Sequence, residues 1–168
     1  DVYKRQDGEA LITRLQQGIT NDPEGNYGKE CEHWLTAKQF EKCPQGLPVS
    51  LRQQLQSHWS TEQEFYPIAG FTLGKVFIGL QPPRGFGEQT QAIYHSPDLP
   101  PPPSYLAFYW WLRTEFQADV IIHFGKHGNL EWLPGRSVGL GAEDFPWQVL
   151  GPIPHLYPFI VNNPGEGT

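Results

Sequence analysis

The sequence has no methionine, only two cysteines and no long apolar run. Two cysteines cannot build the disulfide framework of a small secreted domain, and the spacing of Cys31 and Cys43 does not match a zinc ribbon. The longest strongly apolar stretch, residues 105–112, is far shorter than the roughly 18 to 20 residues that cross a bilayer. The given sequence does not begin with a basic segment followed by an apolar core, so we expect no signal peptide. We therefore expect reduced thiols in a cytoplasmic chain without a membrane span.

Adjacent Cys31, Glu32 and His33 leave a second interpretation of the thiols open, because these three side chains are all types that bind metal ions.

Basic residues are also scarce, with 12 Lys and Arg against 18 Asp and Glu and a net charge of −6. A protein that binds nucleic acid needs a basic stripe to neutralise phosphates, and this sequence contains none, so we expect no nucleic-acid partner. Eighteen glycines and seventeen prolines predict a large share of loop. The six Trp, seven Tyr and ten Phe stabilise by burial, which predicts a folded, globular chain.

Both ends of the sequence predict a fragment of a larger, multidomain chain. Residues 1–6 (DVYKRQ) read like a translated sequencing adapter, and without a methionine the native start is missing. The sequence stops at residues 165–168 (GEGT), in the middle of a motif. We expect a helical segment over residues 7–67 and an α/β region over residues 68–168 that is truncated at its C-terminus.

Hydrophobic periodicity predicts an α/β protein whose first third is helical. Helical spacing or capping residues mark segments 9–17, 36–43, 51–59, 105–116 and 143–150. Strand-forming residues gather in segments 75–80, 118–123 and 157–161. The unbroken apolar run before His123 favours a strand buried on both faces, in a short and mostly parallel sheet. The helix at 105–116 is apolar nearly all round, which predicts burial on most sides in a larger protein.

The strongest chemical pattern follows the strand at 118–123. His123, His127 and Glu131 recur at intervals of four in the segment HFGKHGNLE. Open α/β sheets bind ligands beyond the carboxyl ends of their strands, which is where this segment would lie. Gly125 favours a tight loop there and lets a flat ligand approach the backbone closely. Two structural histidines in a turn are the alternative interpretation.

Two other kinds of site are less well supported. A His/His/Glu zinc hydrolase remains an alternative, although the helical metalloprotease signature has Glu directly after the first His, where Phe124 stands. Residues 70–75 (GFTLGK) have three residues between the glycines instead of the four of a phosphate loop, and Val76 replaces the Ser or Thr. We therefore expect no ATP hydrolysis by this chain.

Three co-ordered motifs resemble one protein family. They are residues 123–135 (HFGKHGNLEWLPG), residues 94–109 with YHSPDL and YLAFY, and residues 150–168 (LGPIPHLYPFIVNNPGEGT). The chain is similar to the large-subunit family of cobaltochelatases (CobN type), and the H component of magnesium chelatase, a relative, has a similar signature. The resemblance covers residues 68–168 strongly and the first third loosely. WLPG and YPFIV look cobalt-type, whereas Asn163 is a departure toward the magnesium type.

The resemblance implies an ATP-dependent chelatase that inserts Co²⁺, as a substrate, into hydrogenobyrinic acid a,c-diamide in cobalamin biosynthesis. It also implies two partners, an AAA+ ATPase subunit and its co-subunit, by which the ATP would be hydrolysed. Insertion of Mg²⁺ into protoporphyrin IX, for chlorophyll biosynthesis, is the alternative within the family. A tetrapyrrole-binding module without chelation activity is a further alternative.

Site roles follow from the spacing together with the resemblance. His123 and His127 are candidate metal-delivery ligands, because imidazole suits an ion such as Co²⁺. Glu131 is the candidate base that removes protons from the macrocycle and the third member of the metal site. Three further residues are candidates for macrocycle binding: Arg84, His95 and Glu166. A surface arginine and a turn histidine without such roles are the alternatives for the first two.

Overall fold

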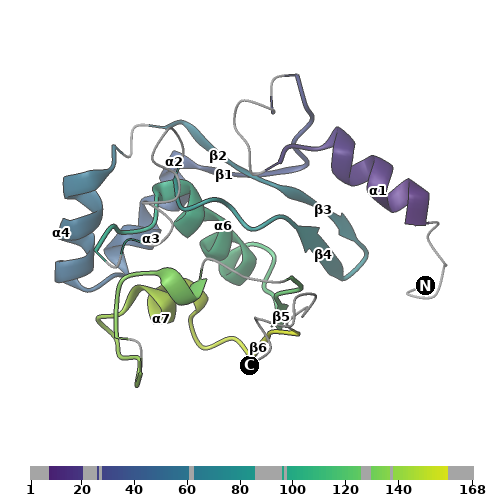
Figure 1. The fold of residues 1–168 in the computed structure, drawn as a ribbon. Helices are drawn as coiled ribbons and strands as arrows, with labels where there is room; N and C mark the ends of the chain where they lie inside the picture. The colour runs from purple at the N-terminus through teal and green to yellow at the C-terminus, as the bar shows by residue number, and fades with distance from the viewer. Residues whose placement is uncertain are drawn as a thin grey trace.

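The computed structural model describes residues 8–20, 26, 28–60, 63–85, 96, 98–125, 130–136 and 138–158, and it gives the main chain only of Glu131. Helices and strands alternate over this part of the chain, which confirms the mixed α/β class (Figure 1). The helices are α1 (Gly8–Gln17), α2 (Ala37–Phe40), α3 (Lys42–Gln45), α4 (Val49–His58), α6 (Pro103–Thr114), the 3-10 helix η2 (Leu130–Trp132) and α7 (Phe145–Leu150). The strands are β1 (His33–Thr36), β2 (Phe65–Ile68), β3 (Gly70–Leu73), β4 (Val76–Gly79), β5 (Ile121–Ile122) and β6 (His155–Leu156).

The strands of the described residues pair into three two-stranded sheets. β1 pairs with β2 and β3 with β4, both antiparallel, while β5 and β6 are parallel. The expectation of mostly parallel pairing is therefore met by β5 and β6 alone. The first third also contains a strand, β1, because His33–Thr36 pair with the distant segment Phe65–Ile68.

The segment tested as a phosphate loop is a β-hairpin. Leu73 pairs with Val76, so Gly74 and Lys75 form a two-residue turn between β3 and β4. Gly74 has a φ of 61°, the left-handed conformation that such turns require and that glycine adopts without strain. Gly74 thus allows the chain to turn between β3 and β4.

Helix α6 lies at the centre of the core, and the prediction that it is buried on most sides is confirmed. Eight of its residues are buried, including Tyr105 and Tyr109 at 0% exposure. The helix contacts β2, α3 and α7 (Figure 1). One hydrophobic cluster joins residues from Leu35 to Val149. The expected boundary between residues 67 and 68 falls inside β2, and residues from both sides of it pack into this cluster.

Two strands differ from their predicted extent. The run at 118–123 yields only Ile121–Ile122, and Ile122 is 56% exposed, so the prediction of burial on both faces is wrong. Among the described strands β5 pairs with β6 alone, and Ile121 is buried in the core while Ile122 faces outward. A strand forms just before the range expected at 157–161, at His155–Leu156, because the carbonyls of Pro154 and Leu156 accept from the N–H groups of Ile121 and His123. Residues 159–161 lie outside the described part of the chain.

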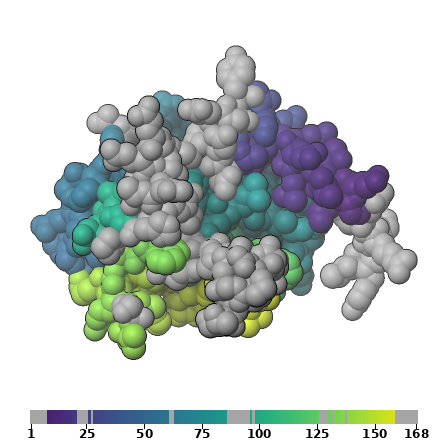
Figure 2. All heavy atoms as spheres, in the orientation of Figure 1, coloured from purple at the N-terminus to yellow at the C-terminus, as the bar shows by residue number. Residues whose placement is uncertain are grey.

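The peripheral helices match their predictions in place, with shifted ends. The expected helix over 36–43 is divided into α2 and α3, and Thr36 begins it through a capping box with Gln39. α4 buries Leu51 and Leu55 and begins after Pro48. α1 buries none of its side chains and lies at one edge of the molecule (Figure 2). None of these helices, nor any other in the described residues, has the length and apolar character needed to cross a bilayer.

Candidate functional site

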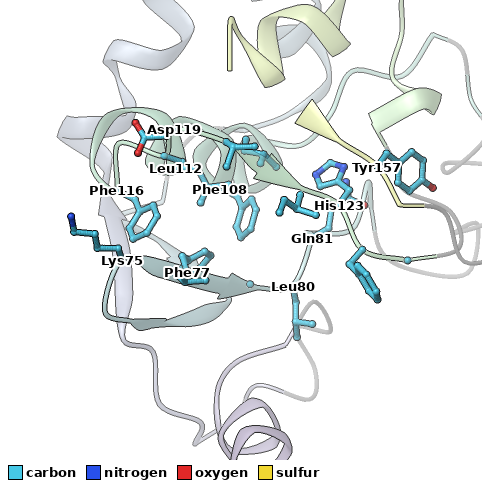
Figure 3. A pocket seen from close by; sticks show the side chains of 18 residues that line it. Lys75, Phe77, Leu80, Gln81, Phe108, Leu112, Phe116, Asp119, His123 and Tyr157 are labelled. Carbon is cyan, nitrogen blue, oxygen red and sulfur yellow. The ribbon is translucent and has the colours of Figure 1, made fainter. Parts of the chain in front are cut away.

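A cavity of about 650 Å³ lies between β4, the C-terminal half of α6 and the segment around β5 (Figure 3). This volume is within the range of small-molecule binding sites. Most of its lining residues are apolar, among them Phe77, Phe108 and Phe116. Polar side chains line its two ends, with His123 and Tyr157 far from Lys75 and Asp119 in the view of Figure 3.

His123 is the predicted site residue that the structure places in this cavity. It directly follows β5, and its main-chain N–H donates to the Leu156 carbonyl at 2.8 Å. Its Nε2 lies 2.9 Å from the hydroxyl of Tyr109 on α6. The Gln81 amide donates to the same hydroxyl at 2.8 Å, and to the hydroxyl of Tyr105 at 3.2 Å. The imidazole is therefore held by groups from separate segments of the chain.

A second imidazole, that of His155, lies against His123. The two ring centroids are 4.5 Å apart at an interplanar angle of 79°. Tyr157 stacks on His155, with centroids 6.3 Å apart. The sequence pattern missed His155, because spacing along the chain relates only neighbouring residues. The signal that could have found it is its position on the strand that continues the α/β alternation, since parallel neighbours end at the same edge of a sheet.

The buried position of His123 makes its imidazole hard to protonate. Burial, and then the nearby charge of His155, lower the pKa of His123 from 6.5 to about 4. At neutral pH the ring is uncharged and keeps one nitrogen lone pair. A neutral imidazole is the form that accepts a hydrogen bond or binds a metal ion.

The other members of the predicted His/His/Glu site are not described in full. His127 lies outside the described residues, and Glu131 is placed by its main chain in η2. The candidate macrocycle contacts His95 and Glu166 also lie outside the described residues. Within the described part of the chain, no three His, Cys, Asp or Glu side chains form a group that could hold a metal ion. Convergence of His123, His127 and Glu131 therefore stays a prediction.

Arg84 is described, and it lies inside the protein with 1% of its surface exposed. Its guanidinium donates to the carbonyls of Ser96 at 3.1 Å and Leu99 at 2.8 Å, and to that of Trp132. Ser96 and Leu99 belong to one loop and Trp132 to η2, more than thirty residues later, so the Arg84 side chain ties these two segments together. A macrocycle carboxylate would have to displace main-chain acceptors to reach this guanidinium.

Cys31, Glu32 and His33 do not form a metal site. The Cys31 thiol donates to the His33 carbonyl at 2.7 Å, and the His33 ring nitrogen is 2.8 Å from the Thr72 hydroxyl. Glu32 is paired with Arg14 at 2.8 Å. Partial burial acts to raise the pKa of Glu32, but hydrogen bonds from the Thr72 N–H and Arg14 outweigh it and lower that pKa. The cluster joins α1 to the β3 strand.

Comparison with known proteins identifies the family. A family model described as CobN/Magnesium Chelatase matches residues 1–168. The aerobic cobaltochelatase subunit CobN of Pseudomonas aeruginosa is 46% identical over 168 residues, which cover 96% of this chain and 14% of that protein. The H component of the magnesium chelatase of Rhodobacter capsulatus is 38% identical over 101 residues, which cover 60% of this chain and 8% of that protein.

A solved structure agrees with these sequence matches. The catalytic subunit of cobaltochelatase from Mycobacterium tuberculosis superimposes with a TM-score of 0.74 and 39% sequence identity. The match covers 96% of this chain and 14% of that one, so the chain spans about a seventh of the relatives it matches. The sequence resemblance is thus confirmed, and it extends through the first third. The chain belongs to the CobN/magnesium chelatase family.

Proposed function

We propose that the chain is part of the large, macrocycle-binding subunit of an ATP-dependent cobaltochelatase, which inserts Co²⁺ into hydrogenobyrinic acid a,c-diamide in cobalamin biosynthesis. The observation that carries the proposal is the imidazole of His123 at one end of a cavity of about 650 Å³ whose lining residues are mostly apolar. The alignment with the CobN relative from Pseudomonas aeruginosa covers 96% of this chain, whereas that with the magnesium-type relative from Rhodobacter capsulatus covers 60%. This difference supports cobalt as the metal.

Metal insertion requires an ion stripped of water, a flat ring held in place and the removal of protons from ring nitrogens. Aromatic walls such as Phe77 and Phe108 suit the face of a macrocycle. His123 would bind the incoming ion, because imidazole is a good ligand for Co²⁺. In this proposal His127 is the second delivery ligand, and Glu131 is the base that takes a ring proton.

The remaining parts of the proposal concern groups beyond the cavity. Arg84, His95 and Glu166 remain the candidate macrocycle contacts. The ATP is hydrolysed by an AAA+ ATPase subunit and its co-subunit, which agrees with the hairpin geometry of residues 70–75. Both cysteines are free thiols, which supports the cytoplasm as the location.

A chelation assay with the full-length subunit, its ATPase partners, Co²⁺ and the macrocycle tests the proposal. We expect His123→Ala to lower the insertion rate with little change in the Kd for the macrocycle, because the imidazole binds the ion while the cavity walls hold the ring. His58→Ala is the matched control, since His58 is exposed on α4 and bonds within its own helix. Wild-type insertion by His123→Ala would contradict the assigned role of His123.

Glu131→Gln tests the proton-acceptor role separately. The amide keeps the shape of the carboxylate but cannot accept a proton at neutral pH. Normal insertion with unchanged macrocycle affinity would remove Glu131 from the mechanism. Replacing Co²⁺ by Mg²⁺ and the corrin precursor by protoporphyrin IX in the same assay distinguishes the magnesium-type activity of this family.

A further inference from the structure

We propose that Tyr109 is a positioning residue for His123, which holds the imidazole so that its Nδ1 meets the incoming metal ion. The inference rests on the proposed function, because it assigns a role to the surroundings of the same imidazole. It is carried by two hydrogen bonds that meet at the Tyr109 hydroxyl, one from the Gln81 amide and one shared with His123 Nε2.

The position of Tyr109 indicates that its hydroxyl has a task beyond packing. The side chain is 0% exposed in the middle of α6, where a phenylalanine would fill the same space. A buried hydroxyl is costly unless it is hydrogen bonded. Tyr109 receives the Gln81 amide at 2.8 Å and reaches His123 Nε2 at 2.9 Å, so both contacts have good geometry.

The contact decides which imidazole nitrogen is available. Nε2 of His123 is engaged with the Tyr109 hydroxyl, so Nδ1 is the nitrogen left for an ion. For Nδ1 to offer its lone pair, Nε2 must carry the ring proton, and its N–H then donates a hydrogen bond to the Tyr109 oxygen, which accepts from both His123 and Gln81. Ligating histidines ordinarily donate their second N–H to such a partner, which fixes the tautomer and the ring orientation.

Tyr105 provides a matched control on the same helix. It lies one turn before Tyr109, is equally buried, and accepts a hydrogen bond from the same Gln81 amide at 3.2 Å. Among the described residues, Tyr109 is the tyrosine whose hydroxyl bonds to His123. Tyr109→Phe and Tyr105→Phe therefore each remove one buried hydroxyl from the same network, and only the first removes the His123 partner.

The test uses the full-length subunit with its ATPase partners and measures kcat, the KM for Co²⁺ and the Kd for the macrocycle. We expect Tyr109→Phe to lower kcat/KM for Co²⁺ about 10- to 100-fold, mainly through KM, with the Kd for the macrocycle unchanged. Tyr105→Phe should stay close to wild type. Equal effects of the two variants would overturn the proposal, because they would indicate a general loss of core stability.

A double-mutant cycle separates positioning from packing. If Tyr109 acts through His123, Tyr109→Phe should cause no further loss in a His123→Ala background, whereas additive losses would overturn the assignment. Gln81→Met, which leaves the tyrosine ring intact, should shift the KM for Co²⁺ in the same direction by less. Wild-type KM values in both Gln81→Met and Tyr109→Phe would also overturn it.

Failure of this inference can be told apart from failure of the proposed function. A wild-type subunit that inserts no Co²⁺, or a His123→Ala variant with full activity, contradicts the proposed function itself. An impaired His123→Ala variant together with an unaffected Tyr109→Phe variant leaves the proposed function standing and overturns only the role of Tyr109.

Discussion

Replacing Arg84 by methionine tests whether this arginine holds the fold together or binds the macrocycle. Methionine is similar in length and apolar, so it can occupy the buried space without a charge. It cannot donate the hydrogen bonds that Arg84 gives to the carbonyls of Ser96, Leu99 and Trp132. We expect the segments around these carbonyls to loosen.

The size of the effect follows from those contacts. A hydrogen bond to a charged group contributes about 1.5 to 3 kcal/mol, so the three bonds together contribute several kcal/mol. The methionine side chain fills the vacated space and recovers part of this loss by apolar contact. We therefore expect a net loss of local stability of at least about 3 kcal/mol, and each 1.4 kcal/mol corresponds to a factor of ten. Amide exchange should therefore accelerate about 100-fold.

Hydrogen exchange followed by mass spectrometry measures this loss in the full-length subunit. Faster exchange is expected in peptides that cover residues 98–102 and 130–136. Arg14→Met is the control, because Arg14 forms an exposed pair with Glu32, and exposed pairs contribute about 0 to 1 kcal/mol. Unchanged protection in Arg84→Met, together with weaker macrocycle binding, would refute the structural role and favour the contact predicted from the sequence.

Three other substitutions test the core and the loop that follows η2. Leu55→Ala, at 0% exposure in α4, should cost about 2 to 5 kcal/mol, seen as faster exchange in α4, and a wild-type rate would contradict its place in the core. Gly135→Ala should lower the thermal midpoint, because φ is 149° and the new Cβ would lie 2.8 Å from the Asp144 Cβ. Hydrogen bonds from the Gly141 N–H, and then from the Arg136 N–H and guanidinium, hold the pKa of Asp144 below its usual 3.8. The Asp144 carboxylate therefore stabilises the fold above pH 3.8, and this stabilisation is lost as the pH falls through the lowered pKa. Asp144→Asn should therefore have a lower thermal midpoint at pH 7, and its midpoint should change less with pH below 4. A midpoint that follows the wild-type pH profile would refute this role of Asp144.

Elements with strong local patterns could be predicted from the sequence. The apolar run in α6 indicated a buried helix, and the spacing of Leu51 and Leu55 indicated the buried face of α4. The hairpin partner β3 was missed because it is only four residues long and lies between Gly70 and Gly74, which predict a turn or loop. Glycines show that a segment can adopt unusual backbone conformations, but the hydrogen bonds between β3 and β4 determine that this segment forms a hairpin.

Burial and pairing over long distances account for the other differences. A charged arginine in a loop is typical of the protein surface, so the sequence suggested a ligand contact for Arg84. Its three acceptors lie in a distant loop and in η2, and no local sequence pattern links them to Arg84. The apolar run did not indicate β6, because the strand is set at His155–Leu156 by its hydrogen bonds to β5. Such contacts form only when separate segments meet.

The surroundings of His123 show where spacing along the chain stops being informative. His123, His127 and Glu131 form a pattern that spacing can find, because their intervals are equal. The groups that control the His123 imidazole come from elsewhere: Tyr109 from α6, Gln81 from the segment after β4, and His155 from β6. Side chains that bind an ion can thus be proposed from a motif, whereas the groups that choose the nitrogen and hold it in place are supplied by the fold. Substitutions at Gln81 or Tyr109 should consequently alter metal handling although both residues lie outside the motif.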